Sequence, residues 1–105
     1  MLKEIQTCFK SERFLFTKHA RDEMEGEEFG EIREREVFEA VQSGKVIETY
    51  PEGEPYPSCL IFGRTSGDRP LHVLCAYTKD EKTAIIITAY QPDPERWIDF
   101  ERRKK

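Results

Sequence analysis

The sequence predicts an α+β fold of two layers, in which a four-stranded antiparallel sheet carries helices on one face. Three observations indicate this fold. Segments with helical periodicity fill the first 43 residues, four strand-like segments follow before residue 91, and the connections between those strands are short. Short connections favour antiparallel neighbours, because a parallel crossover needs a much longer connection. All residues, 1–105, are expected to form a single domain with one core.

The beginning of the chain is expected to hold two helices and a short apolar segment. Residues 2–10 carry apolar side chains at helical spacing, which predicts a short amphipathic helix. Residues 13–16 are mostly apolar and fit either an edge strand or a buried connector. Thr17 is a preferred type of N-cap residue, so a second helix is predicted over residues 18–28.

Residues 33–43 give the most regular helical pattern of the chain. Val37, Ala40 and Val41 form a narrow apolar stripe, and the glutamates between them are expected to face water. Gly44 follows directly, at the position where a left-handed C′ glycine commonly ends a helix. A third helix is therefore predicted here.

The four strands of the sheet are expected in the second half of the chain. Residues 45–50 and 58–64 are predicted strands on either side of a proline-rich loop. Residues 70–91 are predicted to form a hairpin around the charged turn at residues 79–82. The three consecutive isoleucines, Ile85–Ile87, are typical of a central strand that is covered on both faces.

A symmetric turn would fix the register of this hairpin. Thr78 would then lie opposite Thr83 and His72 opposite Ala89, with Gly63 of the preceding strand beside His72. A slip of one residue would move every side chain to the other face of the sheet.

The C-terminal residues are expected to close the domain. Pro92 ends the last strand, and residues 94–101 are predicted to form a helix that buries Trp97. The basic tail at residues 102–105 is either a frayed, solvated terminus or a local patch for a polyanion.

The composition of the chain limits which partners, locations and cofactors are expected. A net charge of -4 gives no general attraction to nucleic acid. The chain has no apolar run that could span a membrane and no signal peptide, so a cytoplasmic protein without a membrane partner is expected. The three separated cysteines, Cys8, Cys59 and Cys75, predict free thiols, with no metal site and no cofactor.

The chain has two histidines, His19 and His72, and histidine commonly transfers protons at neutral pH. His19 is either a catalytic group near a helix start or a solvated capping residue. His72 is either a catalytic group or a strand histidine that is satisfied by a neighbouring hydroxyl, such as Thr78, or by a backbone group.

Three arginines, Arg21, Arg64 and Arg69, are candidates for binding a phosphate, because a guanidinium offers a fixed fork of donors. Each is otherwise a surface arginine. Tyr90 and Thr88 end the last predicted strand, where a small molecule or RNA could dock at the sheet edge. The alternative is a core tyrosine with its hydroxyl at the rim.

Several segments, in this order, resemble one small bacterial family. They are Thr17–Ala20 with Met24, Val37 with Gly44–Glu48, Cys59–Gly63, Arg69–Val73, and Ile87–Tyr90 with Pro92. Together they resemble the family called domain of unknown function 4258, over roughly residues 16–97. The resemblance implies a branch of the RelE-type toxin fold, a helix pair on a curved antiparallel sheet. It also implies either a ribonuclease-like toxin with RNA as its substrate or a degenerate relative of one, and a small zinc-finger antitoxin, similar to those of the MqsR toxin group, as a partner.

One position departs from the family pattern. The family usually has an arginine directly before the methionine of its first motif, whereas this chain has Glu23 there and an arginine at Arg21. A carboxylate at this position weakens the expectation of RNA binding, because affinity for RNA depends largely on neutralising phosphates.

Two functions are therefore expected as alternatives. The first is a metal-independent endoribonuclease toxin, with His19 or His72 as acid or base, Arg21 or Arg64 stabilising charge, and Tyr90 positioning a base. It requires these groups to converge in one open cleft.

The second is a non-catalytic protein-binding module of the same fold. Its partner would dock on the sheet face or pair with the edge strand at residues 45–50. It requires an exposed apolar patch instead of a catalytic cleft.

Overall fold

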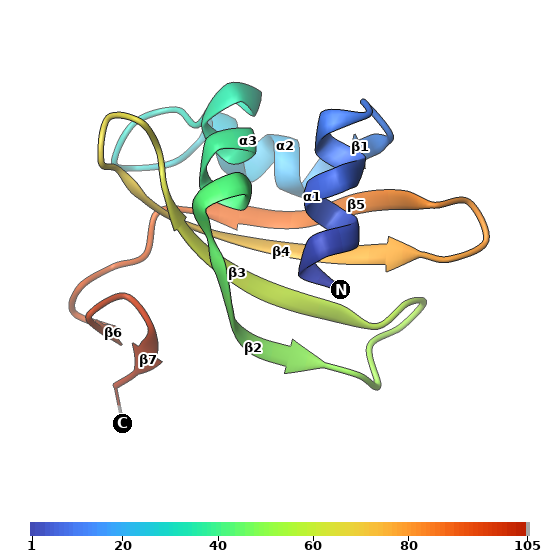
Figure 1. Ribbon diagram of the computed structural model, residues 1–105. Helices are drawn as coiled ribbons and strands as arrows, with labels where there is room; N and C mark the ends of the chain where they lie inside the picture. Colours follow the sequence, from blue (N-terminus) through green and yellow to red (C-terminus); the bar gives the residue numbers. More distant parts are fainter. Residues whose placement is uncertain (105) are drawn as a thin grey trace.

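The computed structural model describes residues 1–104 (Figure 1). Its helices are α1 (Leu2–Lys10), α2 (Lys18–Glu25) and α3 (Glu34–Ser43), and its strands are β1 (Phe14–Phe16), β2 (Lys45–Tyr50), β3 (Ser58–Arg64), β4 (Pro70–Thr78), β5 (Thr83–Tyr90), β6 (Trp97–Ile98) and β7 (Arg102–Arg103). The predicted α+β class is confirmed. No helix in this part of the chain is long and apolar enough to cross a membrane.

The main sheet has five strands, in the order β1-β5-β4-β3-β2. The four predicted strands pair antiparallel, but β1 adds a fifth strand that runs parallel to β5. The prediction of a four-stranded, purely antiparallel sheet was therefore wrong, and the edge-strand alternative for residues 13–16 is correct. Backbone hydrogen bonds from Ala84 to Arg13 and from Thr17 to Ile86, each 3.0 Å, hold β1 in place. These partners are far apart in the sequence, so local pattern could not reveal the pairing.

All three helices lie on one face of the sheet, which is the upper face in Figure 1. The core between the two layers takes apolar side chains from both, including Ile5, Phe9, Ala20, Met24, Val37, Val41, Ile61, Val73 and Ile86. The three cysteines are buried free thiols. The other face is called the helix-free face below.

The start of α2 follows the predicted chemistry. The Thr17 hydroxyl accepts a hydrogen bond from the Ala20 amide at 3.1 Å, which confirms it as the N-cap. The helix ends at Glu25, three residues earlier than predicted, because the chain turns at Gly26 and returns to bond to Met24 through the Ile32 amide.

Two glycines allow α3 to approach the sheet closely. A Cβ atom on Gly63 would lie 1.8 Å from the carbonyl oxygen of Ala40, and one on Gly44 would lie 2.6 Å from the same atom. Gly44 has a φ of -88°, so it is not the left-handed C′ glycine that the sequence predicts. Its small size is what the structure requires.

A β-bulge changes the predicted register of the central hairpin. Thr78 lies opposite Thr83 as predicted, but the pairing shifts farther along, so that His72 lies opposite Tyr90 and not Ala89. The extra residue in β5 moves the Tyr90 side chain to the same face as His72.

On its other side His72 lies opposite Phe62, whereas Gly63 lies opposite Leu71. The expectation that Gly63 leaves space beside His72 was therefore wrong. An aromatic ring lies beside the imidazole instead.

The C-terminal residues form the hairpin of β6 and β7 and not the predicted helix over residues 94–101. Asp99 and Phe100 have φ values of 53° and 62°, which turn the chain back on itself. Burial of Trp97 overrides the helical spacing of this segment. Arg102 and Arg103 lie in β7 and are therefore not frayed, and Lys105 of the predicted tail lies outside the described residues.

Candidate functional site

His72 lies on the helix-free face and is completely buried. Its Nε2 is 2.6 Å from the carbonyl oxygen of Phe100, and its Nδ1 is 3.1 Å from the hydroxyl of Tyr90. A carbonyl oxygen can only accept, so Nε2 carries the proton and Nδ1 accepts the hydrogen bond that the Tyr90 hydroxyl donates. Both nitrogens of the imidazole are thereby occupied.

Aromatic rings surround this pair. The ring of Trp97 stands perpendicular to the imidazole with centroids 4.4 Å apart, and the rings of Tyr90 and Phe62 are at 5.2 and 5.9 Å. Burial lowers the pKa of His72 below its usual value, and burial raises the pKa of Tyr90 to about 12. The pair is therefore neutral near pH 7.

This geometry matches the structural alternative for His72. The sequence suggested a hydroxyl such as Thr78 or a backbone group as the partner, and the structure provides the hydroxyl of Tyr90 in place of Thr78 together with the backbone carbonyl of Phe100. The Thr78 hydroxyl instead lies 3.4 Å from the carbonyl oxygen and the amide nitrogen of Thr83.

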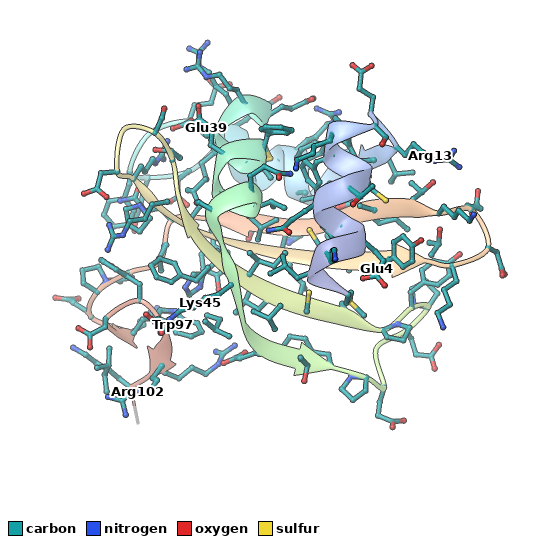
Figure 2. The ribbon with its side chains drawn as sticks, in the orientation of Figure 1. Glu4, Arg13, Glu39, Lys45, Trp97 and Arg102 are labelled. Carbon is teal, nitrogen blue, oxygen red and sulfur yellow. The ribbon has the colours of Figure 1, made fainter. Side chains whose placement is uncertain are left out.

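Ion pairs fasten the C-terminal hairpin over this pair. Arg103 donates to both carboxylate oxygens of Glu48 on β2, at 2.9 and 3.1 Å, and Lys45 pairs with Glu101 at 2.6 Å. Hydrogen bonds from Arg103 lower the pKa of Glu48, which also accepts a hydrogen bond from Tyr50. Figure 2 shows Lys45 and Trp97 below the sheet, on the side away from α1 and α3.

His19 is not brought to His72. It lies on α2, which packs against the other face of the sheet, and its side chain is 67% exposed. Its Nε2 is 3.8 Å from a carboxylate oxygen of Glu23. The two histidines therefore do not share one cleft.

The three candidate arginines are also dispersed. Arg21 pairs with Glu34 at 2.9 Å and lies over the Phe16 ring. Arg64 lies over the rings of Phe62 and Phe100, each 5.6 Å away, beside the aromatic cluster.

Arg69 ties three loop segments together. It donates to the side chain of Gln91 at 2.7 Å, to the carbonyl oxygen of Glu31 at 3.1 Å, to that of Gly30, and to the carboxylate of Glu36. Its donors are engaged within the protein. Thr88 lies opposite Leu74 on the helix-free face, one row from Tyr90.

Two glutamates complete the edge of β5 where β1 ends. Glu23 accepts from the amide of Ala89 at 3.2 Å, and Glu27 accepts from the amide of Gln91 at 2.7 Å. These carboxylates replace the carbonyl oxygens of a further strand. Burial is the main cause that raises the pKa of Glu23. Glu23, which stands where the family usually has an arginine, therefore has a structural role in this chain.

A cleft of about 930 Å³ lies between the end of α2 and the C-terminal hairpin. Its charged lining residues are the carboxylates Asp22, Glu23, Glu27, Glu28, Asp93 and Glu95 and the cations Arg96, Arg103 and Lys104. Phe29, Tyr90, Gln91 and Trp97 supply most of the remaining surface. We call it the β5-edge cleft.

The β5-edge cleft contains one sequence candidate, Tyr90, and neither histidine. The other lining residues were missed as site residues, except that the sequence identifies Trp97 as buried and offers Arg103 and Lys104 as part of a basic tail that could bind a polyanion. A hairpin in place of the expected helix brings them together, so local pattern gave no signal. Over residues 1–104, no group of three or more His, Cys, Asp or Glu side chains is placed to hold a metal ion.

A family model, Domain of unknown function (DUF4258), matches residues 16–91. This match spans most of the chain. The chain belongs to the DUF4258 family. No curated protein and no solved structure matches it. The DUF4258 match covers α2, α3 and the strands from β2 to β5, includes only the last residue of β1, and ends before the hairpin that covers His72.

Proposed function

We propose that this DUF4258 domain is a non-catalytic protein-binding module whose β5-edge cleft receives a basic segment of a partner protein. The observation that supports this proposal is the charge of the cleft, which is lined by six carboxylates and only three cations. A basic segment is attracted to such a lining, while a polyanion is repelled. The chain as a whole carries a net charge of -4, which favours the same partner.

The carboxylates of the cleft differ in whether they already have a partner within the protein. Glu23 and Glu27 accept from the backbone of β5, and Asp22 pairs with Lys18 at 2.7 Å. Glu28 and Glu95 are exposed and make no ion pair within residues 1–104. These two are the groups that would meet a partner's lysine or arginine.

The aromatic residues of the cleft add affinity for such a group. Phe29 is 48% exposed at the rim, and Tyr90 lies deeper. An alkyl chain with a cationic end can pack on aromatic surface while its charge remains near the carboxylates. The state of His72 supports a role without catalysis, because both of its nitrogens are occupied and it is fully buried.

A selection from a displayed library of random peptides tests this proposal. Peptides enriched on the wild-type protein should be rich in lysine and arginine, and their binding should weaken as salt rises. Trp97 is the only tryptophan and lines the cleft, so its fluorescence should change on binding.

The Glu28→Lys, Glu95→Lys double variant should lose the enriched peptides. The Glu52→Lys, Glu54→Lys double variant is the matched control, because it makes the same change of charge in the loop between β2 and β3. Enriched peptides without basic residues, or equal binding by the two double variants, would overturn the proposal.

The ribonuclease function is a second candidate, favoured by one observation. Tyr90 is hydrogen-bonded to His72 and lines the cleft together with Arg96, Arg103 and Lys104. On this hypothesis the domain is a RelE-like cytoplasmic toxin that cleaves RNA, and the basic segment in the cleft belongs to a small zinc-finger antitoxin.

Incubation of RNA with the purified protein in EDTA tests the second candidate. Cleavage that Tyr90→Phe abolishes, and that Tyr56→Phe leaves intact, would support it. Absence of cleavage across several RNAs would leave the binding module as the better function.

A further inference from the structure

The C-terminal hairpin, residues 93–104, is attached to the rest of the domain at few points. Among the residues that the structure describes, its backbone-to-backbone hydrogen bonds all close within the hairpin itself, and it pairs with no strand of the main sheet (Figure 1). The chain before it is tied down as far as Gln91, whose amide donates to Glu27, and the next residue, Pro92, has no amide hydrogen. The hairpin is therefore a separate unit that begins where the sheet ends.

Apolar contacts are the first of two kinds that hold the hairpin against the helix-free face. The Trp97 ring stands against the imidazole of His72, and the Phe100 ring lies 6.2 Å from that of Phe62. The carbonyl oxygen of Phe100 accepts the hydrogen bond that His72 donates. These contacts all involve the turn and the first strand of the hairpin.

The two ion pairs of the hairpin are the second kind of contact. Lys45 pairs with Glu101, and Arg103 pairs with Glu48. The two cations are 60% and 63% exposed, so water and salt weaken both pairs. A two-stranded hairpin is only marginally stable by itself, and Phe100 adds a left-handed backbone conformation that side chains rarely adopt. The closed position therefore depends on these few contacts with the sheet.

The position of the hairpin decides which surface the domain presents. In the closed position it forms one wall of the β5-edge cleft, to which it contributes Trp97 and all three cations. Movement away from the sheet would remove this wall. It would also expose Tyr90, His72 and Phe62, which the strand registers place next to one another.

We propose that the C-terminal hairpin is a strap that opens as a unit about Gln91 and Pro92, while the five-stranded sheet and its helices stay folded. A segment with few contacts opens at a lower free energy than the whole domain unfolds. The closed strap presents the β5-edge cleft, and the open strap presents the imidazole of His72. The strap therefore selects between two sites, and it does so whichever of the two functions proposed above is correct.

Chemical labelling of the two histidines tests the strap. Diethyl pyrocarbonate modifies accessible neutral imidazoles, and mass spectrometry after proteolysis measures the rate at each site. His19 is the internal reference, because its side chain is 67% exposed. Alkylation of Cys59 and Cys75 by N-ethylmaleimide reports global unfolding, because both thiols are buried in the core between the sheet and the helices.

The expected result is that His72 reacts while the core thiols stay protected. Each rate is divided into the rate of the same site in the urea-unfolded protein, which gives a protection factor. The protection factor of His72 should be at least about 10-fold smaller than those of Cys59 and Cys75.

A charge exchange at the ion pair away from the cleft shows whether the strap controls this rate. Lys45→Glu replaces the attraction to Glu101 by a repulsion, so it should speed the labelling of His72 about 3- to 10-fold. The rates at the core thiols should not change. Addition of Glu101→Lys should restore the wild-type rate. Lys79→Glu makes the same change of charge in the turn between β4 and β5, and as the matched control it should have no effect.

The strap hypothesis fails on either of two results. The first is a His72 as strongly protected as the core thiols, because the imidazole would then be reached only by global unfolding. The second is a labelling rate at His72 that Lys45→Glu leaves unchanged. Neither measurement involves a peptide or an RNA, so failure of the strap would leave the proposed functions as they stand, and they can fail while the strap holds.

Discussion

The hydroxyl of Tyr90 lies 3.1 Å from Nδ1 of His72, beneath a hairpin that supplies the other hydrogen-bond partner of the same ring. This contact joins two residues that the sequence selects separately as catalytic candidates. It makes them a neutral pair, with His72 buried and Tyr90 half-buried at the β5-edge cleft, that anchors the C-terminal hairpin to the sheet. A ribonuclease mechanism that uses His72 would need the imidazole to be uncovered first.

Removal of the Tyr90 hydroxyl should test this anchoring. Tyr90→Phe leaves Nδ1 of His72 buried without a donor, so the free energy of unfolding should fall by about 1–3 kcal/mol. Urea denaturation measures the change. Tyr56→Phe removes an exposed hydroxyl and should leave stability within about 0.5 kcal/mol of the wild type. Equal stability of Tyr90→Phe and the wild type would mean that the contact is not formed.

The pH dependence of stability should report His72. Burial lowers its pKa in the folded protein, so the unfolded chain binds a proton more readily. Stability from this residue is present above the unfolded pKa of about 6.5 and is lost as the pH falls through and below that value. Denaturation between pH 7.5 and pH 5.5 should show this loss. His72→Gln should flatten the slope, whereas His19→Gln, at an exposed position, should keep it.

The two glutamates at the β5 edge should protect the amides that they accept from. Glu23→Ala with Glu27→Ala leaves the amides of Ala89 and Gln91 without partners, which should cost about 1–3 kcal/mol. Hydrogen exchange at these two amides should become faster. Glu28→Ala, at an exposed neighbouring position, should change neither quantity.

The close approach of α3 to the sheet predicts a steric limit at Gly63. Gly63→Ala places a Cβ atom 1.8 Å from a backbone oxygen of α3, so the helix must move. The expected loss of stability is about 3 kcal/mol or more, measured by thermal or urea unfolding. Gly67→Ala, whose new Cβ has its nearest neighbour at 3.8 Å, is the control and should be nearly neutral. A stable Gly63→Ala variant would contradict this packing.

The features predicted correctly from the sequence depend on local chemistry. The Thr17 cap, the third helix and the four antiparallel strands each follow from short patterns. The features that were missed depend on distant partners. Nothing near residues 13–16 indicates that β1 pairs with β5, and no local signal marks the bulge that moves Tyr90 to the face of His72.

The candidate site shows the same division. The sequence identifies histidine, arginine and tyrosine as candidates by residue type alone. What each one does depends on where its helix, strand or loop lies in the fold. His19 and His72 lie on opposite sides of the sheet, and Arg69 is used by its surrounding loops. In the sequence, Glu23 and Glu27 look like part of a solvated acidic run. Their hydrogen bonds to the amides of β5 and Gln91 join residues 66 and 64 positions apart, and the local sequence contains no signal of such distant partners.

The parallel pairing of β1 with β5 has a consequence for how the protein folds during its synthesis on the ribosome. Thr17 and Ile87, which are hydrogen-bonded, are 70 residues apart. The helices are therefore synthesised before β5, which completes the sheet that they cover. Their apolar faces cannot all be buried until β5 has been synthesised, and only then can the core close. A pause of the ribosome before that point would leave a nascent chain that cannot fold and that chaperones must shield.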